Sequence, residues 1–203
     1  MATPRFNAVA TTLALLSSAT GCAGTAQGPA QASPPPVSRY PSTEADARFM
    51  SAMIGHHAQA VVMAGWAPTH GASPSVLRLA ERLMSGQQDE IATMQQWLRD
   101  RGRPVPQGHN AEHGHLMPGM LSDAQLKQLE AAKGPEFDRL FLTFMIQHHR
   151  GAVAMVKELF GTPGSAQDDT VFKFASDVNV DQTTEIARME RMLSALPGGD
   201  PSS

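Results

Sequence analysis

The residues in this chain best suited to chemistry are two adjacent histidines that occur twice in similar surroundings. Residues 49–64 read FMSAMIGHHAQAVVMA and residues 141–156 read FLTFMIQHHRGAVAMV, and eight of the sixteen aligned positions are identical. Neutral imidazole and thioether sulfur are both ligands of transition metals. The repeated pattern therefore predicts a metal site, whose candidate ligands are Met53, His56, His57, Met63, Met145, His148, His149 and Met155.

Helical geometry would bring these side chains together. With 3.6 residues per turn, the four candidates of each copy fall on one arc of about 120°. The residue at the centre of that arc, Ala60 in the first copy and Ala152 in the second, is small enough to let two helices approach closely. Two such helices, packed face to face, would enclose four imidazoles and up to four thioethers.

The donor set favours copper over other common metals. Di-iron helical bundles use Glu-x-x-His pairs, whereas this chain has Met53-x-x-His56 and Met145-x-x-His148. The thioether removes the hard, negatively charged bridge that iron and manganese need and favours a soft ion, so we expect copper as Cu(I). The alternative is that the methionines fill the core and the histidines bond to backbone or a nearby acid. The repetition of the whole pattern favours metal binding.

The segments downstream of the two copies also repeat a polar feature. Gln87 and Glu90 correspond to Gln182 and Glu185, three residues apart in each segment. These four side chains could accept the second imidazole N–H of a ligating histidine and fix its ring orientation, or they could lie on a solvated helix flank. Met94 and Met189, on the same segments, are expected in the core.

A second group of candidate ligands lies between the two copies, in QGHNAEHGHLMPGM at residues 107–120. Its glycines and proline predict a loop. The loop could hold a second, more exposed copper site or could simply be flexible and polar; the candidate ligands are His109, His113, His115, Met117 and Met120. His70 stands apart from both groups and is expected on the surface.

The elements that must position these residues are helices. Apolar residues recur with a period near 3.6 through two repeat units, 43–101 and 135–196, and each unit is broken near its middle by glycine and proline. A short additional helix is predicted at 122–132. No segment alternates with a period of two. We predict an all-α fold, an antiparallel four-helix bundle made of two duplicated helical hairpins.

The N-terminal segment is typical of export. Arg5 precedes an apolar stretch that ends at Ala19-Thr20-Gly21-Cys22, which resembles a bacterial lipobox. We expect residues 1–21 to be a signal peptide and Cys22 to be lipidated, which places the protein at the outer face of the cytoplasmic membrane or in the periplasm. An ordinary secretory peptide is the alternative. Residues 22–42 read as a tether, 43–196 as the domain and 197–203 as a tail.

Composition excludes several classes of function. Among 203 residues, 17% are charged, the net charge is −3, and there is no long basic run, so we expect no nucleic-acid partner and contact with a membrane only through the anchor. A single cysteine excludes an internal disulfide framework. The chain has no Gly-x-Ser-x-Gly elbow or phosphate-binding loop.

Several separated motifs resemble the bacterial domain-of-unknown-function family 305. They are MIGHHAQAVVMA, MIQHHRGAVAMV, QQDEIATMQQWL and MPGMLSDAQLKQLEAAKGPEFDRLF, and the resemblance covers roughly residues 43–196. It implies a ferritin-like four-helix bundle that is exported and often lipid-anchored, with copper bound in some members by the Met and His of the repeated motif. One departure is that Trp97, which closes the first unit, corresponds to Met192 in the second. The two halves are therefore not expected to bind equally.

The leading hypothesis is an exported, lipid-anchored copper-binding protein, not an enzyme, that sequesters, stores or delivers copper to an unidentified partner protein. One rival is a helical interaction module with a structural histidine pair, which predicts that the arc from Met53 to His56 is exposed in metal-free protein. The other rival is a ferritin-like metal-dependent oxidase. It needs Glu-x-x-His pairs where the repeated helices carry Met-x-x-His.

Overall fold

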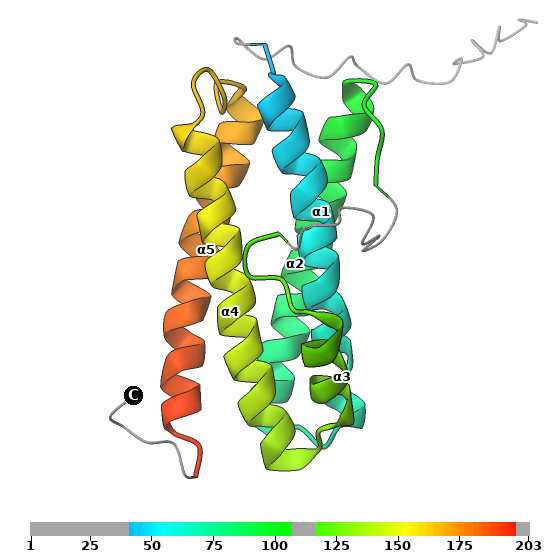
Figure 1. Cartoon of the computed structure of the whole chain (residues 1–203), viewed down its shortest axis with the longest axis vertical. Coiled ribbons are helices and arrows are strands. Elements are labelled where there is room, and N and C mark those ends of the chain that lie inside the picture. Colours follow the sequence, from blue (N-terminus) through cyan, green and yellow to red (C-terminus); the bar gives the residue numbers. More distant parts are fainter. Residues whose placement is uncertain (1–40, 107–116, 198–203) are drawn as a thin grey trace, which may run out of the picture. The chain divides into compact units, whose positions relative to one another are not determined.

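The computed structural model describes residues 41–106 and 117–197, and this part of the chain is helical with no strand. The helices are α1 Glu44–Gly65, the 3-10 turn η1 Ala67–Thr69, α2 Pro74–Asp100, α3 Asp123–Ala131, α4 Gly134–Gly161 and α5 Asp169–Ser194. Helices α1 and α2 form one antiparallel hairpin and α4 and α5 another, and α1 packs against α4 (Figure 1). The predicted all-α bundle is confirmed. The expected signal peptide, Cys22 and nearly all of the tether lie outside the described residues.

Short polar motifs start the helices. The Thr43 Oγ1 accepts a hydrogen bond from the Asp46 backbone N–H, and the Asp46 carboxylate accepts one from the Thr43 N–H, which is a capping box at α1. Ser73 caps α2 ahead of Pro74 at the first helical position. Ser122 and Gln125 form a second capping box at α3. Each motif satisfies backbone N–H groups that the first helical turn cannot pair internally.

The apolar core falls into two clusters separated by a polar layer. The α3 cluster includes Ala60, Met63, Leu83, Phe137, Phe141 and Met145. The turn cluster includes Met50, Met53, Trp97, Ala152, Met155 and Val171. On both α1 and α4, the histidine pair lies between residues of one cluster and residues of the other. The hydrophobic burial that holds the bundle is therefore interrupted at the level of the histidines.

The expectation that His70 lies on the surface is wrong. His70 is 6% exposed. Its Nε2 donates to the Glu130 backbone O at 2.7 Å, and its Nδ1 lies 2.9 Å from the Thr69 hydroxyl. The His70 ring also packs against Phe137, with ring centroids 5.2 Å apart. The residue is buried because α3 folds over the turn between α1 and α2, a long-range contact that local sequence does not reveal.

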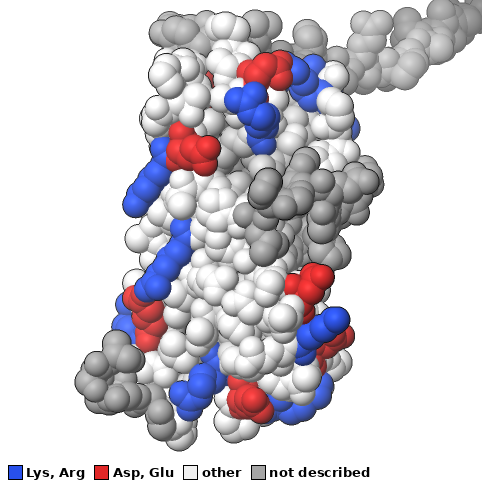
Figure 2. All heavy atoms as spheres, in the orientation of Figure 1, with Lys and Arg blue, Asp and Glu red and all other residues white. Residues whose placement is uncertain are grey.

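The surface carries charges of both signs. On the face shown in Figure 2, most Lys and Arg side chains lie beside Asp or Glu side chains, and uncharged residues separate these groups. Within the described residues, no helix combines the length and apolar character that a bilayer span requires.

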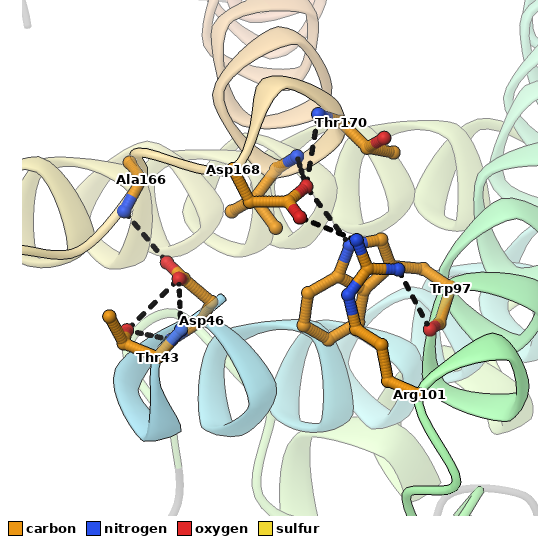
Figure 3. A network of polar contacts seen from close by, with 8 residues as sticks. Thr43, Asp46, Trp97, Arg101, Ala166, Asp168 and Thr170 are labelled. Atoms are coloured by element: carbon orange, nitrogen blue, oxygen red, sulfur yellow. Dashed lines mark hydrogen bonds and ion pairs between the residues drawn. The ribbon is translucent and has the colours of Figure 1, made fainter. Parts of the chain in front are cut away.

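Two buried carboxylates tie together the end of the bundle where α1 begins (Figure 3). Asp46, fully buried, accepts a hydrogen bond from the Ala166 N–H at 2.7 Å, which joins α1 to the turn between α4 and α5. Asp168 caps α5 and accepts from Trp97 Nε1 at 3.2 Å and from Arg101 Nη2 at 2.5 Å, both on or next to α2. Burial by itself raises the pKa of Asp168, but hydrogen bonds from Val171, Trp97 and Arg101 outweigh it and leave the pKa below its ordinary value.

Replacing Asp168 with Ala should destabilise the bundle by about 2 to 4 kcal/mol, because it removes a helix cap and leaves the buried Trp97 N–H unpaired. Urea denaturation at pH 7 measures the difference. The pKa of Asp168 is lowered in the folded state. The difference in free energy of unfolding between wild type and variant should therefore have its full value above the ordinary carboxyl pKa and shrink in stronger acid. Asp100→Ala, at an exposed carboxylate, should change stability by less than about 0.5 kcal/mol. Equal effects of the two changes would contradict the assignment.

Candidate metal centre

The four repeated histidines are fully buried and lie in a row. The ring centroids of His56 and His148 are 3.8 Å apart where α1 and α4 pack together. His57 and His149 extend the row on either side, 6.3 Å from His56 and 6.2 Å from His148. Neighbouring residues of a helix point about 100° apart. The inner histidine of each pair therefore faces the other hairpin, and the outer one faces the partner helix of its own hairpin.

The outer histidines bond to carboxylates. His57 Nε2 lies 2.7 Å from Glu90 Oε2 on α2, and His149 Nε2 lies 2.9 Å from Glu185 Oε2 on α5. Both carboxylates are about one-fifth exposed, so they connect the buried rings with the surface. An ionised carboxylate only accepts, so Nε2 of each imidazole carries the proton.

The inner histidines bond to backbone carbonyls. His56 Nε2 donates to the Pro118 O at 3.0 Å, and His148 Nε2 donates to the His56 O at 3.0 Å. All four rings thus use Nε2 as a donor. In the neutral imidazole, this tautomer leaves a lone pair on Nδ1.

Those lone pairs have no partner within the described residues. The buried side-chain nitrogens and oxygens that lack a hydrogen bond there are the Nδ1 atoms of the four histidines and the Oε1 atoms of Gln87 and Gln182. Each orphaned acceptor costs about 1–3 kcal/mol in a dry core. All of them stand at matched positions of the two repeat units. A bound cation would satisfy acceptors of this kind.

Thioethers flank the imidazole layer on both sides. Met53 and Met155 belong to the turn cluster, and Met63 and Met145 belong to the α3 cluster. Three of these side chains are fully buried, and Met155 is 7% exposed. Each side of the layer thus has one methionine from α1 and one from α4. Met94 and Met189 are also fully buried, in line with the expected core positions.

Carboxylates and imidazoles do not assemble a site by themselves. In the described ranges, no group of three or more His, Cys, Asp or Glu side chains is placed to hold a metal ion. The methionines that flank the layer are the other candidate donors. The expected contact of Gln87 and Gln182 with imidazole N–H groups is not made, because Glu90, Glu185 and two carbonyls occupy those positions.

The second candidate group is only partly described. His109, His113 and His115 lie outside the described residues. Met117 and Met120 are half-buried, and Met117 packs against the turn cluster beside Gly55. The exposed copper site expected in this loop stays a prediction.

A segment that contains these methionines, residues 117–121, crosses the bundle and positions His56. The Gln59 side chain donates to the Leu121 O and accepts from the Leu121 N–H, at 3.1 and 2.8 Å. Pro118 and Gly119 lie directly on Gly151, where a Cβ would stand 1.9 Å from the Pro118 O. Gln59 and Gly151 occupy matched positions of the sequence repeat. The two copies of the repeat carry different residues at this position, and that difference is the sequence signal for the contact with segment 117–121.

The candidate ligands Met53 and His56 are fully buried in the structure. This burial does not favour the interaction-module alternative, which expects both side chains to be exposed in metal-free protein. Burial also lowers the pKa of His56 to about 3, aided by the neighbouring His57. Burial, with the other histidines nearby, lowers the pKa of His148 well below its ordinary range. Both rings are therefore uncharged at neutral pH.

This bundle and its paired histidines define the class of protein. The chain belongs to the DUF305 family, a domain of unknown function, which matches residues 46–193. A similar solved structure is a DUF305 protein from Streptomyces coelicolor, whose name assigns it provisionally to secreted proteins. It is 28% identical with a TM-score of 0.67 and covers 78% of this chain and 98% of its own. A DUF305 fragment from Deinococcus radiodurans is 32% identical with a TM-score of 0.66, covering 77% and 99%.

A particular relative carries metal in its crystals. The Cu(I)-bound form of CopM is 29% identical to this chain with a TM-score of 0.60, covering 75% of this chain and 98% of its own. CopM has also been solved in Cu(II)-bound, silver-bound and apo forms. Among curated protein sequences, none matches this chain.

Two helical glycines should respond oppositely to alanine. Gly151→Ala forces Pro118 and Gly119 away from α4 and should destabilise the protein by about 1–3 kcal/mol. Gly86→Ala, on α2, meets nothing within 4 Å and should stabilise it by about 0.5–1 kcal/mol. Thermal and urea denaturation measure both changes. A neutral Gly151→Ala variant would show that segment 117–121 does not pack as described.

Metal-free protein should lose stability in mild acid. Because the pKa of His56 falls from 6.5 to about 3 on folding, the unfolded chain binds protons between these values that the folded chain excludes. His148 acts in the same direction. The free energy of unfolding should therefore be constant above pH 6.5 and fall by roughly 1–3 kcal/mol per pH unit below it. Urea denaturation in chelator from pH 7 to 4 tests this. A His56→Asn/His148→Asn variant should show a shallower slope, and an unchanged slope would contradict it.

Proposed function

We propose that this protein binds copper as cargo within the imidazole and thioether layer between α1 and α4. One observation carries the proposal. Four imidazoles are each oriented by an Nε2 hydrogen bond so that an unpartnered Nδ1 lone pair remains in a buried layer. Cations satisfy lone pairs of this kind, and no hydrogen-bond donor from residues 41–106 or 117–197 pairs with them.

The donor chemistry supports copper in its reduced state. Uncharged imidazole and thioether together suit a soft, singly charged ion, because burial of that ion costs less than burial of a doubly charged one. The hydrogen bonds from Nε2 to Glu90 and Glu185 fix the orientation of the outer rings, as carboxylates commonly do for metal-bound histidine. The copper and silver forms of CopM, a structural relative, support the same choice.

We further propose that the protein sequesters, stores or delivers the ion and catalyses no reaction. The candidate ligands are enclosed by both apolar clusters. An oxidase of the di-iron type would use carboxylates as metal ligands, whereas Glu90 and Glu185 here bond to the histidines. Export and attachment through Cys22 remain part of the proposal, supported by the lipobox-like Ala19-Thr20-Gly21-Cys22.

Anaerobic titration of the purified protein with Cu(I) against a chromogenic chelator tests the proposal. Wild type should bind copper tightly, and replacement of His56, His57, His148 and His149 by Ala should abolish that binding. Met53→Leu/Met145→Leu keeps the core volume and removes two sulfurs, so we expect at least tenfold weaker Cu(I) binding. This second variant still tests the site if the quadruple variant fails to fold.

His70→Ala is the matched control. His70 is buried like the candidate ligands, but both of its ring nitrogens have partners, so copper binding should persist. Circular dichroism establishes that each variant is folded. Equal binding by wild type and by a folded quadruple variant would place copper outside the layer and overturn the proposal.

A further inference from the structure

A groove of about 490 Å³ runs between α2 and α5. Its lining includes the two glutamates that accept hydrogen bonds from the outer histidines. Gln87 and Glu90 line it from α2, and Asp181, Gln182 and Glu185 line it from α5. Two arginines, Arg82 and Arg188, complete its charged rim. The groove is open to solvent, unlike the imidazole layer.

Two buried amide oxygens line the groove without a partner. Gln87 is 3% exposed and Gln182 is 2% exposed, and Oε1 of each has no hydrogen-bond partner among the residues that the structure describes. An amide oxygen only accepts. It is satisfied by a donor, such as a water molecule held by a cation, or by the cation itself. Two such oxygens at matched positions in one groove indicate a ligand that presents positive charge or O–H groups.

The charges of the groove favour a cation. Partial burial raises the pKa of Asp181, and the negative charges of Glu90, Glu185 and Asp177 raise it further, although Lys173 lowers it. Asp181, Glu90 and Glu185 all line the groove. Arg82 Nε lies 3.9 Å from Glu185 Oε1 and offsets part of that field. Three carboxylates and two arginines line the groove, so it keeps a small excess of negative charge, which attracts cations.

Glu90 and Glu185 join the groove to the histidines. Each carboxylate lines the groove and also accepts the Nε2 hydrogen bond of a buried imidazole, from His57 and His149 respectively. Only the side chain of Glu90 or of Glu185 therefore separates a cation in the groove from an outer imidazole ring.

We propose that the α2–α5 groove is the port through which a hydrated metal cation reaches the imidazole layer. The inference rests on the proposed function. Glu90, Asp181 and Glu185 attract the ion, and the amide oxygens of Gln87 and Gln182 accept hydrogen bonds from its water shell. The ion keeps that shell because, in the part of the chain described, no three His, Cys, Asp or Glu side chains are placed to chelate it directly. Dehydration and capture follow in the layer behind the glutamates.

Mn²⁺ is a suitable probe of the port, since it prefers oxygen ligands and broadens nearby NMR signals. Added to the purified full-length protein, Mn²⁺ should broaden the side-chain amide signals of Gln87 and Gln182 well before those of Gln59 and Gln125, which lie on α1 and α3. Uniform broadening of all four, or none, would overturn the proposal. Because this readout does not need the histidines to bind metal, it separates the port from the proposed function.

Stopped-flow measurement of copper association tests the route. Asp181→Asn should slow association at least threefold at low salt, with a smaller effect at high salt. Dissociation should slow with it, because a port residue acts on the barrier in both directions, so affinity should change less than the association rate. Asp89→Asn, the same charge change at an exposed α2 carboxylate outside the groove, is the matched control.

The outcomes distinguish the two proposals. Tight copper binding by wild type, with equal association rates for Asp181→Asn and Asp89→Asn, would overturn the port and leave the proposed function standing. Mn²⁺ in the groove of a protein that binds no copper would overturn both the function and the route. Loss of affinity in Asp181→Asn without slower association would assign that residue a structural role and would also overturn the route.

Discussion

A single hydrogen bond from each imidazole Nε2 determines the chemistry of this bundle. The two glutamates on α2 and α5 and two backbone carbonyls accept these bonds and fix the orientation of the four rings. Burial keeps at least the inner two uncharged. Helix packing that moved α2 or α5 away would release the outer rings, so the apolar stripes, caps and end contacts all serve this arrangement.

Much of this could be predicted from the sequence. The 3.6-residue spacing and the glycine and proline breaks locate the long helices to within a few residues. The repetition of the His-His motif identifies the row of buried rings. Periodicity shows which face of a helix is apolar, and it shows roughly where each helix begins and ends. Both are properties of contiguous residues.

Contacts between distant segments were beyond that kind of inference. The carbonyl of Pro118 reaches His56 only because Gln59 and Gly151 hold segment 117–121 across two helices. His70 is buried because a short helix far along the chain covers it. The groove between α2 and α5 likewise depends on how the two hairpins pack together. The residues next to Gln87 and Gln182 in the sequence do not reveal that Oε1 of each lacks a hydrogen-bond partner among the described residues.

The division of the core into two apolar clusters has a consequence for the lifetime of the protein. A layer of buried imidazoles separates the clusters, so apolar packing contributes least to stability at the level of the histidines. An ion that binds only the folded state adds stability that grows with the logarithm of its free concentration. If the layer binds copper as proposed, scarcity of the ion would shorten the half-life of the protein against proteases, while abundance would preserve it. The amount of protein could thus follow supply without any change in its synthesis.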